Sequence, residues 1–294
     1  MIKLQTPVDI PESKIKISFD DSILLLGSCF SDNIGLIMKN MGFRACTNPF
    51  GTLYNPVSVC NAVRRLGSAV PFGEDECVQM GAGAQLVCSF SHHTAAARAT
   101  SAEFLVNANE SLAEASSFFR EASTIIITLG TAWTFRFNAT GEIVSNCLKR
   151  DAKEFTRERL SLKTCSVLLN SLVGKYPQKR FIFTVSPIRH LKDSAHGNQI
   201  SKSTLLMAVE SVVENHPDQC VYFPAYEIMM DELRDYRFYA EDMVHPSQQA
   251  VNYIWERFCD FALPETERAT LEKNRKAFLQ SQHRLITKSQ NTDK

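Results

Sequence analysis

The sequence lacks an excess of charge of either sign, because its 294 residues include 32 basic and 32 acidic side chains. A chain with a formal net charge of zero has no overall field to hold phosphate backbones or anionic lipid. It also lacks any apolar run near the roughly 20 residues that cross a bilayer. Its first residues lack the basic and then apolar layout of a secretory signal. We therefore expect a cytoplasmic protein with no nucleic-acid partner and no membrane partner.

The nine cysteines are odd in number, scattered along the chain and never spaced as C-x-x-C. This pattern is typical of reduced thiols rather than of a disulfide framework or a zinc site. His92 and His93 are the other candidate metal ligands, but adjacent histidines cannot share one helix face and no carboxylate is suitably spaced. We expect no metal and no cofactor, and we interpret His92 as lining a ligand pocket or as hydrogen-bonded within its loop.

Apolar side chains are plentiful, at 44% of the residues, and they occur as short continuous runs. Such runs predict parallel strands that are covered on both faces. The three clearest candidates are Ile23–Leu26, Thr124–Leu129 and Arg180–Val185, and two weaker ones are Phe43–Cys46 and Val221–Phe223.

Amphipathic helical patterns alternate with these runs. They cover residues Asp32–Met41, Pro56–Leu66, Ser101–Glu121, Ser161–Lys175, Ser201–Asn215 and Ser247–Phe261. Strands that alternate with helices predict an α/β fold, with three layers around a doubly wound, mostly parallel, flavodoxin-like sheet. In such sheets ligands bind outside the carboxyl ends of the strands, so functional residues are expected directly after the strands.

No internal repeat or linker divides the chain. We expect one domain over residues 1–263, with an irregular insertion or lid at about 67–100 that is rich in Gly, Ala and Ser. Residues 264–294 are strongly charged and predict a C-terminal helix and tail.

The first chemical signal follows the first predicted strand, in the segment Gly27-Ser28-Cys29-Phe30-Ser31. A Ser or Cys at a strand-to-helix turn is exposed at the sheet edge, and the helix amino end favours a developing negative charge. The alternative is structural, with Ser28 as a helix cap and Cys29 as a small buried side chain.

The second signal is Asp242-Met243-Val244-His245-Pro246, just before the last predicted helix of the domain. A carboxylate three residues before a histidine can orient the imidazole and leave its other nitrogen as a general base. The alternative is a capping aspartate beside a surface histidine. The G-x-S-x-G elbow of α/β-hydrolases is absent.

Taken together, the ordered motifs resemble the GSCFA family, an SGNH/GDSL-like hydrolase family described mainly from bacterial sequences. The resemblance covers roughly residues 20–260. It is carried by Gly27–Ser31, Asn48–Pro56, Thr128–Trp133, Ser186–Asp193 and Asp242–Pro246. It implies an SGNH hydrolase fold and a nucleophile, histidine and aspartate that act together on an acyl ester.

The resemblance also implies roles for single residues. In the wider superfamily the first block reads Gly-Asp-Ser with serine as nucleophile, so an ungapped match places Cys29 on the nucleophile position and Ser28 on the aspartate position. We favour Cys29 over Ser28, because a thiol paired with His245 is easier to activate than a hydroxyl. Asp242 would orient His245.

The positions expected to supply oxyanion donors match the superfamily blocks only in part. Gly51 corresponds to the second superfamily block and offers a backbone N–H. The third block normally supplies an asparagine, where this chain has Ala132 after Gly130 and Thr131. Thr131, Asn55 or a backbone group would then replace it, or the site is a weaker hydrolase than its relatives.

His190 and Asp193 follow the fourth predicted strand and form a rival histidine–carboxylate pair that is placed to contact substrate. We predict an acyl-ester hydrolase of esterase or O-deacetylase type, which acts on a small-molecule or carbohydrate ester. The alternatives are an acyltransferase with the same site, or a non-catalytic carbohydrate- or metabolite-binding module. The pattern makes no prediction of an oligomeric state.

Overall fold

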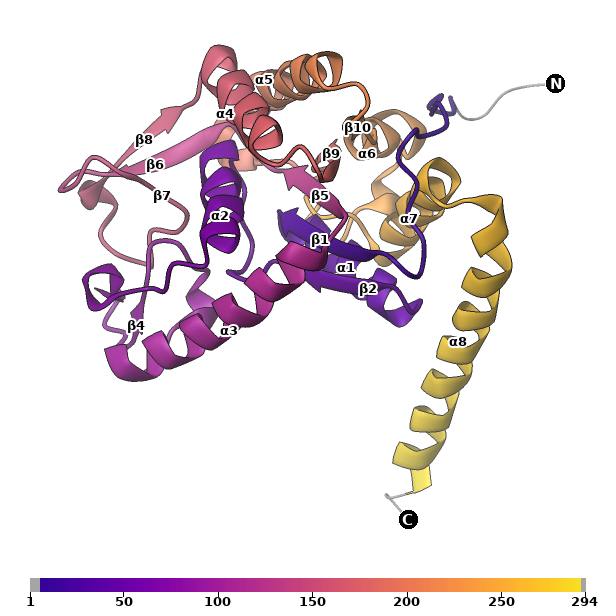
Figure 1. The fold of residues 1–294 in the computed structure, drawn as a ribbon, viewed down its shortest axis with the longest axis horizontal. Coiled ribbons are helices and arrows are strands. Elements are labelled where there is room, and N and C mark those ends of the chain that lie inside the picture. The colour runs from indigo at the N-terminus through magenta and orange to yellow at the C-terminus, as the bar shows by residue number, and fades with distance from the viewer. Residues whose placement is uncertain (1–5, 292–294) are drawn as a thin grey trace.

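The computed structural model describes residues 6–291, and its centre is a parallel five-stranded sheet (Figure 1). The strands are β1 (Ser22–Gly27), β2 (Arg44–Thr47), β5 (Thr124–Leu129), β9 (Arg180–Val185) and β10 (Cys220–Tyr222). Their spatial order is β10-β9-β5-β1-β2. Counted along the chain, this is the 2-1-3-4-5 order of flavodoxin-like folds, with its switch point between β1 and β5. The predicted α/β fold with a doubly wound sheet is confirmed.

Each strand divides its apolar side chains between two helical layers, because successive side chains point to opposite faces. In β1, Leu24 and Leu26 belong to one core cluster, whereas Ile23 and Leu25 belong to the other. The first face is covered by α2 (Pro56–Ser68), α3 (Ser101–Glu121), α4 (Leu162–Lys175) and α5 (Ser194–Asn215). The second face is covered by α1 (Cys29–Asn40) and α7 (Gln248–Ala262).

The predicted strands and helices are all present, and two helices begin earlier than predicted. α1 begins at Cys29 rather than near Asp32, so Cys29 to Ser31 lie in the first turn of the helix, Ser28 is its N-cap and Gly27 ends β1. α5 begins at Ser194 rather than at Ser201. Its first turns are polar and carry no apolar stripe from which the helix could have been recognised.

The chain between β5 and α4 forms a second, antiparallel sheet, which no sequence pattern predicted. It consists of β6 (Trp133–Phe137), β7 (Ile143–Val144) and β8 (Phe155–Arg159), in the order β7-β6-β8. A short 3-10 turn, η3 (Ala152–Glu154), precedes β8. Strand β8 reads FTRER, and such a charged segment has no apolar run to mark it.

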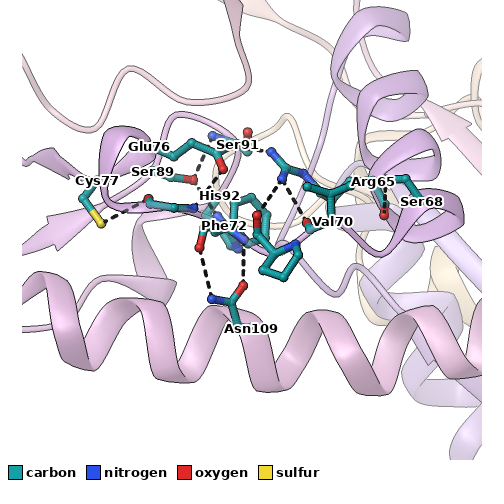
Figure 2. A network of polar contacts seen from close by, with 12 residues as sticks. Arg65, Ser68, Val70, Phe72, Glu76, Cys77, Ser89, Ser91, His92 and Asn109 are labelled. Carbon is teal, nitrogen blue, oxygen red and sulfur yellow. Dashed lines mark hydrogen bonds and ion pairs between the residues drawn. The ribbon is translucent and has the colours of Figure 1, made fainter.

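The irregular region at 67–100 contains a small hairpin, β3 (Val78–Gln79) with β4 (Val87–Cys88), and two 3-10 turns, η1 (Glu74–Glu76) and η2 (Thr94–Ala96). Polar contacts fasten it to the neighbouring helices (Figure 2). Asn109 of α3 accepts a hydrogen bond from the backbone N–H of Phe72 at 2.7 Å and donates one to its carbonyl at 3.1 Å. Arg65 of α2 forms an ion pair with Glu76.

The chain after β10 supplies short helical segments and the last two long helices. The short segments are α6 (Ala225–Glu227), η5 (Ile228–Glu232), η6 (Tyr236–Phe238) and η7 (Glu265–Glu267), in addition to η4 (Leu191–Asp193) after β9. The last helix, α8 (Arg268–Asn291), projects from the body of the molecule (Figure 1). The part of the predicted tail after Asn291 lies outside the described residues. None of the helices between residues 6 and 291 combines the length and apolar character that crossing a membrane requires.

Gly27 ends β1 at the switch point, in a backbone conformation that other residues rarely adopt. Its φ is +136°, and a Cβ atom there would lie 2.1 Å from the carbonyl oxygen of Thr128 on β5. Only glycine allows the two strands to pair at this position while the chain turns into α1.

We predict that Gly27→Ala lowers the free energy of unfolding by about 3–5 kcal/mol, from backbone strain plus a clash with β5. Urea unfolding followed by circular dichroism measures this change. The matched control is Gly174→Ala in α4, where a Cβ meets nothing within 4 Å. It should be neutral or stabilise by up to about 1 kcal/mol. Equal stabilities of the two variants would contradict the assignment.

Candidate active site

A cavity of about 620 Å³ opens at the carboxyl ends of the central strands, where ligands bind in doubly wound sheets. Residues directly after β1, β5 and β9 line it, together with the loop before α7 and the second sheet. The principal lining residues are Ser28, Cys29, Tyr54, Asn55, Thr131, Trp133, Phe135, Val144, Ser145, Arg157, Ser186, Ile188, Arg189, His190, Asp193 and His245. None of the lining residues comes from 67–100, so that region contributes nothing to the wall of this cavity.

Cys29 is the first residue of α1 and is partly buried at the cavity wall. Burial raises the pKa of its thiol, and the nearby Asp32 carboxylate raises it further. The backbone N–H groups of Cys29 and Phe30 and the Lys202 ammonium oppose this shift. The net direction is upward, so the resting side chain is a thiol and needs a base before it can act as a nucleophile.

Ser28 occupies the N-cap position of the same helix. Its side-chain oxygen accepts a hydrogen bond from the Phe30 N–H at 3.3 Å, and the residue is 1% exposed. Ser28 therefore has the helix-capping role that we gave as the structural alternative. Cys29, which follows it, has the more accessible side chain of the two.

His245 and Asp242 are in direct contact in the loop before α7. The imidazole Nδ1 lies 2.6 Å from Asp242 Oδ2, and the other carboxylate oxygen accepts hydrogen bonds from the Val244 and His245 N–H groups, both at 2.9 Å. These three interactions lower the pKa of Asp242 to about 2. The carboxylate is therefore ionised throughout the neutral range and directs Nδ1, so that Nε2 remains for proton transfer.

Cys29 and His245 line the same cavity, although they are separated by more than two hundred residues in sequence. We expected a connected line from the sulfur through the imidazole to the carboxylate. The imidazole–carboxylate link is present, but no hydrogen bond joins the Cys29 sulfur to His245. Two of the three groups are thus in contact, and the third lines the same cavity.

The backbone N–H groups of Gly51, Gly130 and Thr131 are all engaged in hydrogen bonds within the protein. The Gly51 N–H donates to the Asn48 carbonyl at 2.7 Å, and Gly51 packs against His93 away from the cavity. The interpretation of Gly51 as an oxyanion donor was therefore wrong. The N–H groups of Gly130 and Thr131 both donate to the Tyr54 carbonyl, at 2.8 and 2.9 Å.

The Thr131 side chain is also hydrogen-bonded within the protein. Its hydroxyl lies 3.0 Å from the Ser201 hydroxyl, and it accepts a hydrogen bond from the Trp133 N–H at 3.1 Å. Thr131 is buried and lines the cavity, and its contact with Ser201 connects the end of β5 to α5.

Asn55 remains as a side-chain donor. It is the N-cap of α2, and its Oδ1 accepts a hydrogen bond from the Ser58 N–H at 3.0 Å. This contact determines which way the amide lies, because only the oxygen can accept. Within residues 6–291 no acceptor is hydrogen-bonded to Nδ2, and Asn55 lines the cavity.

His92 lies in the core and not in the cavity, which corrects its interpretation as a pocket residue (Figure 2). It is 2% exposed, and its Nδ1 lies 2.7 Å from the Ser89 hydroxyl. Burial lowers the pKa of His92 to about 4, so the ring is neutral. The alternative of a hydrogen-bonded loop residue describes it. In the described part of the chain, no three His, Cys, Asp or Glu side chains are grouped as a metal ion requires.

His190 does line the cavity, but it does not form a pair with Asp193. Asp193 forms its ion pair with Arg157 of β8 instead. Burial, with the positive charge of Lys202, lowers the pKa of His190 to about 4. A neutral imidazole that lacks a carboxylate partner is suited to contact substrate rather than to replace His245 as the base.

The GSCFA family profile matches residues 22–258, from β1 into α7. The chain belongs to the GSCFA family. Among solved structures, it is similar to LAE5, an alpha/beta hydrolase enzyme from the metagenome of Lake Arreo, Spain, with a TM-score of 0.44 and 11% sequence identity. The similarity covers 83% of this chain and 95% of that chain. No curated protein matches the chain.

Several cavity residues of this GSCFA chain were not found from its sequence. Tyr54, Trp133, Arg157 and Arg189 line the cavity, and Lys202 lies beneath it with no exposed surface. Trp133 and Arg157 belong to the second sheet, which had no strand signal. Tyr54 was part of a family motif, but nothing in its spacing distinguished it from a core aromatic.

We predict that Asp32→Asn speeds alkylation of Cys29 about three- to tenfold at pH 7.5, because loss of the carboxylate charge lowers the thiol pKa by up to about one unit. Asparagine keeps an oxygen for the hydrogen bond that Asn48 donates to Asp32. Iodoacetamide labelling with mass spectrometry of the Cys29 peptide measures the rate. The exposed Asp218→Asn is the control and should leave it unchanged. A slower or equal rate in Asp32→Asn would rule out this electrostatic effect.

Proposed function

We propose that this protein hydrolyses acyl esters through a covalent acyl-enzyme on Cys29. One observation carries the proposal: a single cavity is lined both by Cys29, at the amino end of α1, and by His245, whose Nδ1 is held by Asp242. A thiol, an oriented imidazole and an ionised carboxylate around one cavity are the parts that nucleophilic acyl transfer requires.

In the proposed reaction His245 Nε2 takes the proton of Cys29, and the sulfur attacks the ester carbonyl carbon. The tetrahedral intermediate collapses as the C–O bond breaks, and His245 returns the proton to the leaving alcohol. His245 then takes a proton from water, whose oxygen attacks the thioester carbonyl carbon. The C–S bond breaks, the acid leaves, and His245 returns the proton to the Cys29 sulfur. Because burial and Asp32 raise the pKa of Cys29, the base is needed in the first step. The contact between sulfur and imidazole would tighten when substrate binds.

Asn55 is the proposed oxyanion donor in place of the asparagine that Ala132 replaces. The cap contact to Ser58 engages Oδ1 and leaves Nδ2 as the donor, and Asn55 lines the same cavity as Cys29. The N–H of Cys29 is the second proposed donor, because it belongs to the free first turn of α1. Together they would stabilise the charge that develops on the carbonyl oxygen.

The proposed substrate is a small-molecule or carbohydrate ester, and an alcohol or amine acceptor in place of water would make the same site an acyltransferase. A cavity of about 620 Å³ is of the size that holds a compact ligand. The second candidate function is a non-catalytic carbohydrate- or metabolite-binding module. It is favoured by the absence of a hydrogen bond between Cys29 and His245 and by Ala132 in the third block.

We predict turnover of short-chain p-nitrophenyl esters or acetylated sugars, with kcat at least about 100-fold lower in His245→Ala, because general base catalysis contributes roughly 10²–10⁴-fold. Cys29→Ala should abolish turnover. Rapid acid quenching with peptide mass spectrometry should find the acyl group on Cys29. An adduct on Ser28, or full activity in Cys29→Ala, would overturn the assignment of the nucleophile. Binding without turnover across the panel would favour the binding module.

We also predict that Asn55→Asp lowers kcat about 10²–10³-fold, because it removes the Nδ2 donor and adds a negative charge beside the oxyanion. Aspartate caps a helix as well as asparagine, so the thermal midpoint should change little. Asn61→Asp, within α2 and exposed, is the control for the added charge. Unchanged kcat in Asn55→Asp, with the fold intact, would exclude Asn55 from the oxyanion site.

A further inference from the structure

Lys202 of α5 is fully buried directly beneath the candidate active site. Its exposed fraction is 0%, and its Nζ donates hydrogen bonds to the carbonyls of Gly130 and Ser186, both at 2.7 Å. Gly130 is the first residue after β5, and Ser186 is the first after β9. The ammonium group therefore joins the carboxyl ends of two adjacent strands at the floor of the cavity.

This arrangement is costly, since a buried ammonium group loses its hydration. Within residues 6–291 no carboxylate forms an ion pair with Lys202. Two carbonyl dipoles compensate only part of the lost hydration. The sheet does not need this side chain to hold β5 and β9 together, because the two strands pair along their whole length. A buried cation without a counter-ion at this position points to a functional requirement.

The groups around Lys202 show what the charge acts on. Ser186, whose carbonyl accepts a hydrogen bond from Lys202, lines the cavity together with Cys29 and His190, and the Tyr226 ring of α6 lies 5.6 Å from Nζ. The positive charge lowers the pKa of both Cys29 and His190. Without the ammonium, the Gly130 and Ser186 carbonyls would present unpaired negative dipole ends at the cavity that Cys29 lines.

We propose that Lys202 is a positioning residue, whose buried ammonium neutralises the Gly130 and Ser186 carbonyls and stabilises negative charge on the Cys29 sulfur. The catalytic use of that sulfur rests on the function proposed above. The electrostatic effect on the thiol does not, because it can be measured in a chain that turns over no substrate.

The sign of the pH dependence follows from the state of the lysine. Burial lowers the pKa of Lys202 to about 7, and a negative Cys29 sulfur raises it again. The ammonium is therefore present below about pH 7 and is lost as the pH rises. Its support of the thiolate must be greatest in mildly acidic solution and must fade in alkaline solution. A purely structural lysine would affect the thiol equally at every pH.

The experiment is the rate of Cys29 alkylation by iodoacetamide from pH 6 to pH 10, in the wild type and in Lys202→Met. The thiolate sulfur displaces iodide, so the rate reports the thiolate fraction, and mass spectrometry of the Cys29 peptide separates it from the other thiols. We expect Lys202→Met to react about tenfold more slowly at pH 6, the effect of about one pKa unit, and at the same rate at pH 10. The ratio cancels any contribution of His245, which both proteins contain.

Lys179→Met is the matched control, because Lys179 is a second buried lysine that donates to backbone carbonyls. It is 3% exposed, and its Nζ lies 2.6 Å from the Phe119 carbonyl and 2.7 Å from the Ala122 carbonyl, at the end of α3. It lies just before β9, at the opposite end of the sheet from Cys29. Lys179→Met should lose stability as Lys202→Met does, with the alkylation profile of Cys29 unchanged.

Superimposed profiles of the wild type and Lys202→Met would overturn the proposal, and so would a ratio that is constant with pH. If Lys202→Met does not fold, the wild type provides the test. Its Cys29 is alkylated with iodoacetate or with iodoacetamide, which leave a carboxylate or a neutral amide on the sulfur. The lysine ¹³Cε signal that titrates near neutral pH should have a higher midpoint with the carboxylate adduct. Equal midpoints would contradict the proposal, whereas failure of the ester panel alone would contradict only the hydrolase.

Discussion

The turn from β1 into α1 is the constraint on which the site depends, and Asn48 at the end of β2 holds it. The Asn48 side chain accepts a hydrogen bond from the Gly27 N–H at 2.8 Å and donates one to Asp32 at 2.7 Å. One side chain thus connects the last residue of β1 with the first turn of α1, and the Gly27 conformation lets the chain turn there without colliding with β5. Cys29 is placed at the cavity because this turn has a single geometry. The Asn48–Gly51 motif is explained by that support, and not by an oxyanion donor.

The parts of the fold that could be predicted from sequence are those with a strong apolar pattern. β1, β5 and β9 are buried on both faces, so their residues form continuous runs, and the amphipathic helices between them required the parallel crossovers. The second sheet has no such pattern, because β8 reads FTRER, with a single apolar residue, and is recognisable only from its pairing with β6. That sheet forms one wall of the cavity. The shape of the site is consequently the part of the molecule that the sequence described least well.

The residues of the candidate site also differ in whether neighbouring residues in the sequence were enough to predict them. The contact between Asp242 and His245 is local, three residues apart, and could be predicted from spacing. Cys29 could be proposed from its place directly after a predicted strand, whereas Asn55 required the family motifs. The helical spacing of Lys202 could have predicted its burial. It lies three residues before Leu205 and seven before Val209, on the buried face of α5. A charged lysine within an apolar stripe departs from the helical pattern. Such departures occur where a functional residue lowers the stability of the fold.

Opposed electrostatic effects meet at Cys29, and their balance explains why a thiol suits this position. The first turn of α1 and the Lys202 ammonium favour the thiolate, whereas burial and Asp32 oppose it and prevail. A resting thiol is protected from oxidation and from stray electrophiles, which attack the thiolate. In the proposed reaction, activation then needs a base that acts when substrate draws sulfur and imidazole together, which is consistent with the absence of a hydrogen bond between Cys29 and His245. A serine hydroxyl has a pKa much further from neutrality, so the same burial would make it still harder to deprotonate. The replacement of serine by cysteine in this block therefore fits a nucleophile that is switched on by its substrate.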